Sequence, residues 1–390
     1  MSFFTSRPGL RRLIPLGAAA AVLAGGAAIA AITEAVDQTA AAPSPAELLS
    51  DVQTARLEGM SGTIVYTADL GLPTIPGLPA ADAAQPGFGS ADLMSLVAGT
   101  HTLRVWYSGP GKARIALLGT IGETDVITNG RDLWVWDSRA NQAVHRTLPA
   151  DPTGGSGPEP TTPPSLTPGQ LSNLVLTALG RSTEVTVGGP VTVAGRTAHE
   201  LVVAPRDRAT LVESVRVAVD AERNIPLRVQ VFGRGHEAPA LEATFTHVSF
   251  DRPADSQFTF NPPPGAKVIE SDPVSDDPAK ASAPKEWAGP KEDAASRAMA
   301  TVGSGWTTVL VFRAPAPDAT APDGQSAELE AYQRFLADLP RVGTGPGAGR
   351  VVSGHLFSVL FTDDGRVLLG AVSPDHLVRA AADPDAQLPS

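Results

Sequence analysis

Apolar and polar residues alternate along a series of short runs in the chain. The clearest example is TNGRDLWVWD, Thr128 to Asp137, in which Asn129-Gly130 separates two apolar runs. Asn-Gly tolerates the positive φ angles of a two-residue turn, so this stretch predicts a hairpin of two antiparallel strands. Further runs of this kind are His101 to Tyr107, Ala113 to Leu118, Thr124 to Thr128, Gln142 to Arg146, Val215 to Asp220, Leu227 to Phe232 and Leu241 to Phe250. The chain is therefore predicted to be mainly β, with locally connected strands.

In the runs at 101–107, 113–118, 132–136, 215–220, 227–232 and 241–250 one parity is apolar, whereas the other is mixed and includes Arg104, Arg114 and Asp132. In a half-buried sheet this asymmetry places one face against a core or a cavity and the other face in water. The apolar residues that we expect to form a hydrophobic ligand-binding face are Leu103, Val105, Tyr107, Ile115, Leu117, Leu133, Val135, Val217, Val229, Val231 and Phe245.

Helical periodicity appears at a few places that could cover such a sheet. Ser44-Pro45 predicts a helix start, and Leu48, Leu49 and Val52 form an apolar stripe behind it. Two further helices are predicted at 91–97 and 171–179. A curved sheet with so little cover either fills with its own side chains or keeps a cavity for an apolar ligand.

Proline-rich segments divide the chain. Pro149 to Thr167 predicts a flexible insertion, and Phe258-Thr259-Phe260 predicts the last strand of a large unit that Pro262 to Pro264 closes. We therefore expect a large domain at 43–268, a charged linker at 269–299 and a small α+β domain at 300–390. The elements expected in the small domain are a strand at Trp306 to Phe312, a helix at Ser326 to Leu339, a hairpin from His355 to Gly370 turning at Asp363-Asp364-Gly365, and a helix at Pro374 to Ala382.

The first 42 residues have the layout of an export leader. Arg7, Arg11 and Arg12 precede an uncharged apolar stretch from Leu13 to Ile32. A basic end before an apolar run is typical of a signal peptide, and this run is also long enough to cross a bilayer. We expect an extracytoplasmic protein, either secreted after cleavage or anchored in the cytoplasmic membrane.

Composition and motifs argue against several functions. The formal net charge of −11 would repel a phosphate backbone, so no nucleic-acid partner is expected. There is no cysteine, and the seven histidines form no HxH or HxxxH pair. GTGPGAG at 343–349 lacks the end of a phosphate-binding loop, and Asp363-Asp364-Gly365 is ordinary turn chemistry. We expect no catalytic residue, no metal and no cofactor. Trp134 and Trp136 could stack on a ligand or pack as structural residues.

Three stretches in succession resemble the LolA/LolB-like lipoprotein-carrier superfamily. They are NGRDLWVWD after the paired strands HTLRVWYSGPGKARIALLG, then DAERNIPLRVQVFG, then FTFNPPPGAKV. The resemblance covers about Pro45 to Val268 and implies a half-open antiparallel β-barrel with a helical lid that holds acyl chains or lipids. In the C-terminal unit, SGWTTVLVF and VLLGAVSPDHL resemble the small second domain of the sigma-factor regulator RseB, also called MucB.

Two functions are therefore open. The first is a membrane-associated, non-enzymatic bacterial protein that binds a lipid, an acyl chain or an acylated protein in the half-barrel, as a carrier or chaperone. The alternative is an RseB/MucB-like envelope-stress regulator that binds an anti-sigma factor or another inner-membrane protein.

Overall fold

A sheet of twelve strands forms the large part of the protein. The computed structural model describes residues 43–73, 98–119, 122–148, 182–271, 299–313, 333–345, 347–383 and 386. The strands of the large sheet are β1 (Met60–Asp69), β2 (Ala98–Tyr107), β3 (Lys112–Leu118), β4 (Glu123–Asn129), β5 (Asp132–Asp137), β6 (Gln142–Thr147), β7 (Thr183–Val193), β8 (Arg196–Pro205), β9 (Val212–Asp220), β10 (Pro226–Gly233), β11 (Pro239–Ser249) and β12 (Lys267–Ser271). The leader, the insertion, the helices expected at 91–97 and 171–179 and residues 272–298 of the linker lie outside the described residues.

The spatial order of these strands is β12-β6-β5-β4-β3-β2-β1-β11-β10-β9-β8-β7, so β12 and β7 are free edges and the sheet is not closed into a barrel. Most neighbours are consecutive in sequence, which agrees with the predicted local connections. The exceptions are β1 with β11, which are antiparallel, and β12 with β6, which are parallel. The half-open, mainly antiparallel architecture expected from the sequence is confirmed.

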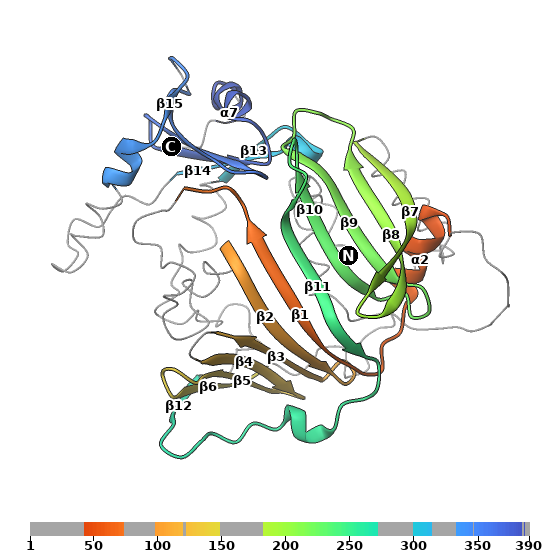
Figure 1. Ribbon diagram of the computed structural model, residues 1–390. Coiled ribbons are helices and arrows are strands. Elements are labelled where there is room, and N and C mark those ends of the chain that lie inside the picture. Colours follow the sequence, from red (N-terminus) through yellow and green to blue (C-terminus); the bar gives the residue numbers. More distant parts are fainter. Residues whose placement is uncertain are drawn as a thin grey trace, which may run out of the picture.

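The sheet is strongly curved. Bulges interrupt the register of β1, β7 and both ends of β10, and bulges increase local twist and bending. As a result β7 touches β11, although three strands separate them in the sheet. Figure 1 shows β7 to β11 wrapping one side of the molecule, whereas β3 to β6 turn away beyond β2.

The prediction of a strand at Phe258-Thr259-Phe260 is wrong. Residues Asp255–Phe258 form a 3-10 helix, η2, within a segment at 251–266 that we call the strap. Strands β3 to β5 already pair on both sides, so the strap finds no free edge and instead lies across their outer face (Figure 1). Beyond the prolines at 262–264 the chain regains strand structure as β12, which the sequence interpretation missed.

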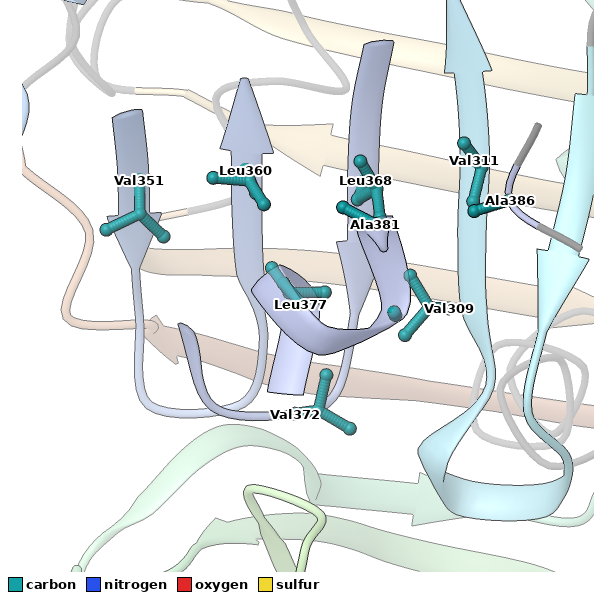
Figure 2. Packing of buried hydrophobic residues seen from close by; sticks show 10 residues of the cluster. Val309, Val311, Val351, Leu360, Leu368, Val372, Leu377, Ala381 and Ala386 are labelled. Carbon is teal, nitrogen blue, oxygen red and sulfur yellow. The ribbon is translucent and has the colours of Figure 1, made fainter. Parts of the chain in front are cut away.

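The C-terminal unit contains a second sheet, ordered β13-β14-β18-β17-β16-β15. Its elements are β13 (Met299–Val302), η4 (Gly305–Thr307), β14 (Val309–Arg313), a helical segment at 333–338, β15 (Arg341–Val342), β16 (Gly349–Ser353), β17 (Ser358–Thr362), β18 (Arg366–Gly370) and α7 (Pro374–Ala381). Figure 2 shows α7 lying on one face of this sheet, with Leu377 and Ala381 directed towards Leu360 and Leu368. The predicted hairpin and last helix are confirmed. The strand predicted from Trp306 begins instead at Val309, because residues 305–307 form η4.

The small unit docks on one end of the large sheet. The N–H of Leu211 donates to the carbonyl of Ala371 at 2.8 Å, and the N–H of His355 donates to the carbonyl of Leu70 at 2.7 Å. The indole N–H of Trp306 donates to the Thr183 hydroxyl at 2.8 Å. Backbone bonds and a shared apolar cluster therefore join the two units.

Candidate functional site

The strand register places the predicted ligand-binding residues on one face of the large sheet. Directly paired residues of neighbouring strands project to the same side. Leu103 pairs with Leu117, Val105 with Ile115, and Val229 with both Val217 and Ala243. The pairs from β9 to β5, together with the alternation along each strand, place all eleven predicted residues on one side. We call this side the inner face.

One row of the inner face is apolar across seven adjacent strands. Its members pair directly from strand to strand, and we call them the central row: Gly62, Val105, Ile115, Val126, Val135, Val144 and Ile269. With strands about 4.8 Å apart, the row is roughly 29 Å long. Val126, Val144 and Ile269 were missed from the sequence. Continuing the parity through Thr124 to Thr128 and Gln142 to Arg146 would have found the first two.

The part of the inner face on β7 to β11 is covered by other elements. Helix α2 (Pro45–Thr54) begins with a complete capping box between Ser44 and Glu47, and its Leu48 packs on Leu201 and Val219. Leu356 and Ala371 of the C-terminal unit pack near Val229 and Val231. The helix predicted at Pro45 is confirmed, and this part of the face is a filled core.

The part on β2 to β6 is more open. Leu103, Val105, Tyr107, Leu117, Leu133 and Val135 are only half-buried. Ile115, in the central row, is 41% exposed, whereas Phe245 is 9% exposed. At the covered end, the Phe245 ring lies over Gly62, where an added Cβ would come within 2.7 Å of the ring. In the central row Ile115 of β3 is exposed, whereas its neighbours on β2 and on β4 to β6 are half-buried, so this part of the face is partly accessible.

The expectation that the opposite face meets water is wrong for β3 to β6. On that outer face, Ile127 and Trp136 are buried, and Phe258 of the strap is 1% exposed. The Phe260 ring lies 5.1 Å from the Trp134 ring and 5.6 Å from the Trp136 ring, measured between centroids. Both tryptophans therefore pack beneath the strap, so they are structural residues and are turned away from the inner face.

On β8 to β10 the outer face is mixed, as expected, with charged side chains next to the buried Phe232. Glu200 accepts a hydrogen bond from Arg228 at 2.9 Å, and the Arg216 guanidinium lies over the Phe232 ring. Such side chains suit a face in contact with water, and they leave the inner face as the dry side of this region.

A few polar side chains lie on the inner face. The Tyr66 and His101 rings face each other across β1 and β2, with centroids 6.2 Å apart, and burial raises the pKa of Tyr66. Arg146 of β6 pairs with Leu133 of β5 on the same side. The sequence interpretation did not select these residues, because it selected only apolar ones.

Among the residues that the structure describes, no group of three or more potential ligands is arranged to hold a metal ion. In the same ranges no helix is both long and apolar enough to cross a bilayer. The apolar inner face is therefore the feature from which we argue function.

The chain matches no family model and no curated protein sequence. It is similar to solved structures. A chain of the Pseudomonas aeruginosa MucA/MucB complex is 16% identical, with 86% of this chain and 96% of that chain covered and a TM-score of 0.39. The LolA superfamily protein NE2245 from Nitrosomonas europaea is 11% identical, with 56% and 99% covered and a TM-score of 0.20. A putative outer membrane lipoprotein-sorting protein domain from Vibrio parahaemolyticus is 10% identical, with 55% and 95% covered and a TM-score of 0.21. Both kinds of protein that the sequence motifs resemble are thus among the structures to which the chain is similar.

Proposed function

We propose that this protein is an exported, non-enzymatic binding protein that holds an acyl chain on the open part of its inner face. The observation that carries the proposal is the central row. It is continuous across seven strands, and it includes an isoleucine that remains 41% exposed. A continuous, partly accessible apolar row next to a filled core provides an elongated surface on which an extended acyl chain can bind.

Affinity should grow with the length of the acyl chain. Each methylene group that leaves water contributes about 0.8 kcal/mol, so two more carbons should tighten binding by roughly tenfold. Apolar burial is also nearly indifferent to salt. Titration of the delipidated protein with neutral acyl esters of increasing length measures this dependence. Equal affinity for short and long chains would contradict the proposal.

A charge placed in the central row should block binding. Ile115→Glu puts a carboxylate at a partly exposed position, so the fold should tolerate it. A bound acyl chain would bury the charge without a partner, which is unfavourable. We expect at least a tenfold loss of affinity for a long acyl ester. Thr186→Glu is the matched control, because Thr186 is exposed on the outer face of β7. Equal effects of the two variants would point to general charge and not to the inner face.

Export rests on the leader at 1–42, and we propose that this segment delivers the protein across the cytoplasmic membrane. The intact mass of the protein from its own host decides between cleavage and a retained anchor. Alkaline carbonate extraction then separates an anchored protein from a peripheral one.

The second candidate is a regulator that binds a membrane protein, and one observation favours it. Strand β13 is an edge of the small sheet and exposes Met299, which is 52% accessible. A photo-crosslinker at position 299, compared with one at the β17–β18 turn at position 363, tests this in host membranes. A discrete membrane protein captured only from position 299 supports the regulator. Removing 300–390 is a poor test, because it would uncover the apolar cluster around Leu70 and Val231.

A further inference from the structure

The Arg146 side chain projects from the inner face beside the β6 part of the central row. The ring of its neighbour His145 stacks on Trp134 with centroids 4.2 Å apart, on the outer side beneath the strap. Successive side chains of a strand point to opposite faces, so Arg146 points inward. Its direct partner Leu133 is one of the inner-face residues, and Val144 of the central row lies two positions away on the same strand.

This arginine differs from the other half-buried arginines of the large sheet. Arg114 is paired with Asp125, Arg196 with Asp220, and Arg228 with Glu200. Arg146 is half-buried, yet within the described part of the chain it has no ion pair and no side-chain hydrogen bond. A guanidinium offers five donors in a planar fork that matches a carboxylate, so an unpaired one beside apolar surface is complementary to an anionic group.

Polar residues bound the central row on the side away from Arg146. Across β4 to β6, the next row of the inner face consists of Thr124, Asp137 and Gln142, which are polar. Across β1 to β3 the corresponding row is Ile64, Leu103 and Leu117, which widens the apolar surface at the covered end. Asp137 is buried and accepts hydrogen bonds from the backbone N–H groups of Arg139 and Ala140. Asp137 pairs with Gln142, four positions from Arg146 on β6, and within the described residues it makes no ion pair with Arg146. The polar row limits the apolar surface on its side, which favours a ligand with one chain over one with two.

We propose that the preferred ligand is a long-chain fatty acid, whose carboxylate binds Arg146 and whose chain follows the central row from β6 towards β1. This rests on the proposed function, since it assigns a ligand class to the same face. From β6 to β1 the row measures about 24 Å, which exceeds the roughly 15 Å depth of one bilayer leaflet, so a chain of membrane-lipid length fits. The head lies near the exposed sheet edge, and the methyl end lies towards Gly62 and Phe245.

The experiment compares palmitate with its neutral methyl ester on the delipidated full chain at pH 8, by calorimetric titration. Arg146→Gln removes the cation, and Arg104→Gln is the matched control on the exposed outer face of β2. We expect the wild type and Arg104→Gln to prefer palmitate. Arg146→Gln should bind palmitate at least about tenfold more weakly and the ester unchanged, because a hydrogen bond to a charged group is lost.

The outcomes separate the two proposals. If the wild type binds palmitate and the ester equally and Arg146→Gln changes neither, the assignment of the head group is wrong and the acyl-binding function stands. Weaker binding of both ligands by Arg146→Gln would also overturn it, since that marks a structural role. Tighter binding of phosphatidylglycerol than of palmitate would overturn the single-chain ligand. Binding of no acyl ligand by the wild type would sink the proposed function together with this inference.

Discussion

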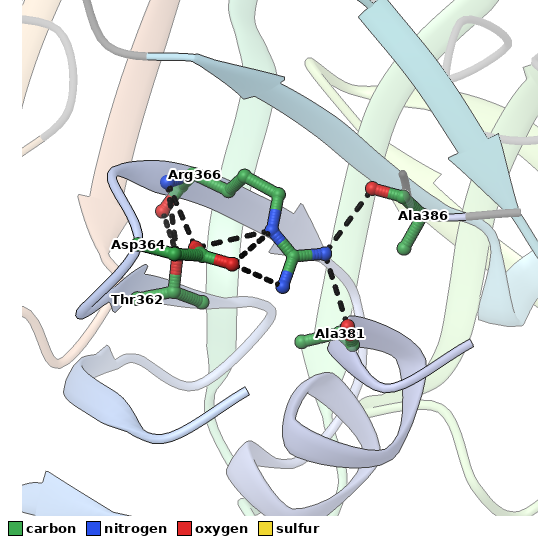
Figure 3. A network of polar contacts seen from close by, with 5 residues as sticks. All are labelled: Thr362, Asp364, Arg366, Ala381 and Ala386. Carbon is green, nitrogen blue, oxygen red and sulfur yellow. Dashed lines mark hydrogen bonds and ion pairs between the residues drawn. The ribbon is translucent and has the colours of Figure 1, made fainter. Parts of the chain in front are cut away.

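Arg366 joins the turn of the C-terminal hairpin to the end of the last helix. Its guanidinium donates to the carbonyls of Ala381 and Ala386 at 3.0 and 3.2 Å and pairs with Asp364 at 2.7 Å, as Figure 3 shows. The side chain is only 9% exposed. A cation at a helix C-terminus is favourable, and its loss here leaves two carbonyls without this donor. We expect Arg366→Met to lower the free energy of unfolding by about 2 kcal/mol, measured in urea.

The same pair makes a prediction about acid stability. The hydrogen bond from Arg366 lowers the pKa of Asp364 from 3.8 to about 2. A carboxyl whose pKa is depressed by folding stabilises the protein fully above its unfolded pKa, and this contribution is lost as the pH falls from about 4 to 2. Asp364→Asn should therefore be less stable at pH 7 and should lose less stability across that range. Parallel urea titrations at pH 4 and pH 2 compare the losses, and equal losses in both proteins would contradict the assignment.

His376 on α7 also makes the protein less stable as the pH falls, but at a higher pH. Among the residues that the structure describes, its buried Nδ1 has no hydrogen-bond partner, and burial together with nearby Arg379 lowers its pKa, with Asp207 opposing. The folded protein then binds fewer protons than the unfolded chain, so stability declines as the pH falls below about 6.5. We expect His376→Leu to be about as stable as the wild type at pH 7 and to lose less stability at pH 5. Thermal melts at the two pH values test this, and a parallel decline would rule it out.

Among the strands, β12 is held at the sheet edge by a charged side-chain bridge as well as by its ladder with β6. Glu270 lies 2.8 Å from Nδ1 of His145, and Asp132 lies 3.1 Å from Nε2. Carboxylates only accept, so both bonds form together only when the imidazole is protonated. Burial lowers the pKa of His145, but these two carboxylates more than offset that effect, so the pKa lies above its ordinary value of 6.5.

The attachment of β12 should therefore depend on pH. A pKa raised by folding gives stability that is complete below about 6.5 and is lost as the pH rises through the folded pKa. Because the carboxylates are exposed, the effect is modest. We expect Glu270→Gln to lower the hydrogen-exchange protection of residues 267–271 a few-fold at pH 6 and very little at pH 9. Protection factors, which remove the intrinsic pH dependence of exchange, provide the comparison.

The docking of the two units makes their stabilities interdependent. Leu356, at 7% exposure, packs in the apolar cluster with Leu70 and Val231 of the large sheet. We expect the wild type to unfold in one transition and Leu356→Ala to split it, since this change costs about 2 to 4 kcal/mol at the junction. Val351→Ala, inside the small unit, is the control that should destabilise without separating the units. Calorimetry distinguishes one transition from two, and a split in the wild type would show that the docking is weak.

Much of the architecture was predictable from local patterns. Side chains of a strand alternate with a period of two, and short turns fix the register of neighbours. The parity of β2 to β5 and β9 to β11 therefore already placed eleven residues on one face, although their role as ligand contacts stays a prediction. The capped helix at Pro45 and the hairpin around Gly365 were predictable for the same reason, because each depends on residues close in sequence.

The tertiary structure decided what lies on each face and at each edge. One of the aromatic rings that pack on Trp134 belongs to Phe260, more than a hundred residues later, and β12 pairs with β6 across a similar separation. The alternation of apolar and polar residues along a strand shows that every second side chain is buried. It does not show which distant segment buries that side chain. The cover on the outer face and the docking of the small unit both follow from such non-local contacts. The sequence by itself therefore determined the strands and the apolar face, whereas only the folded chain decided where that face is filled and where it stays open.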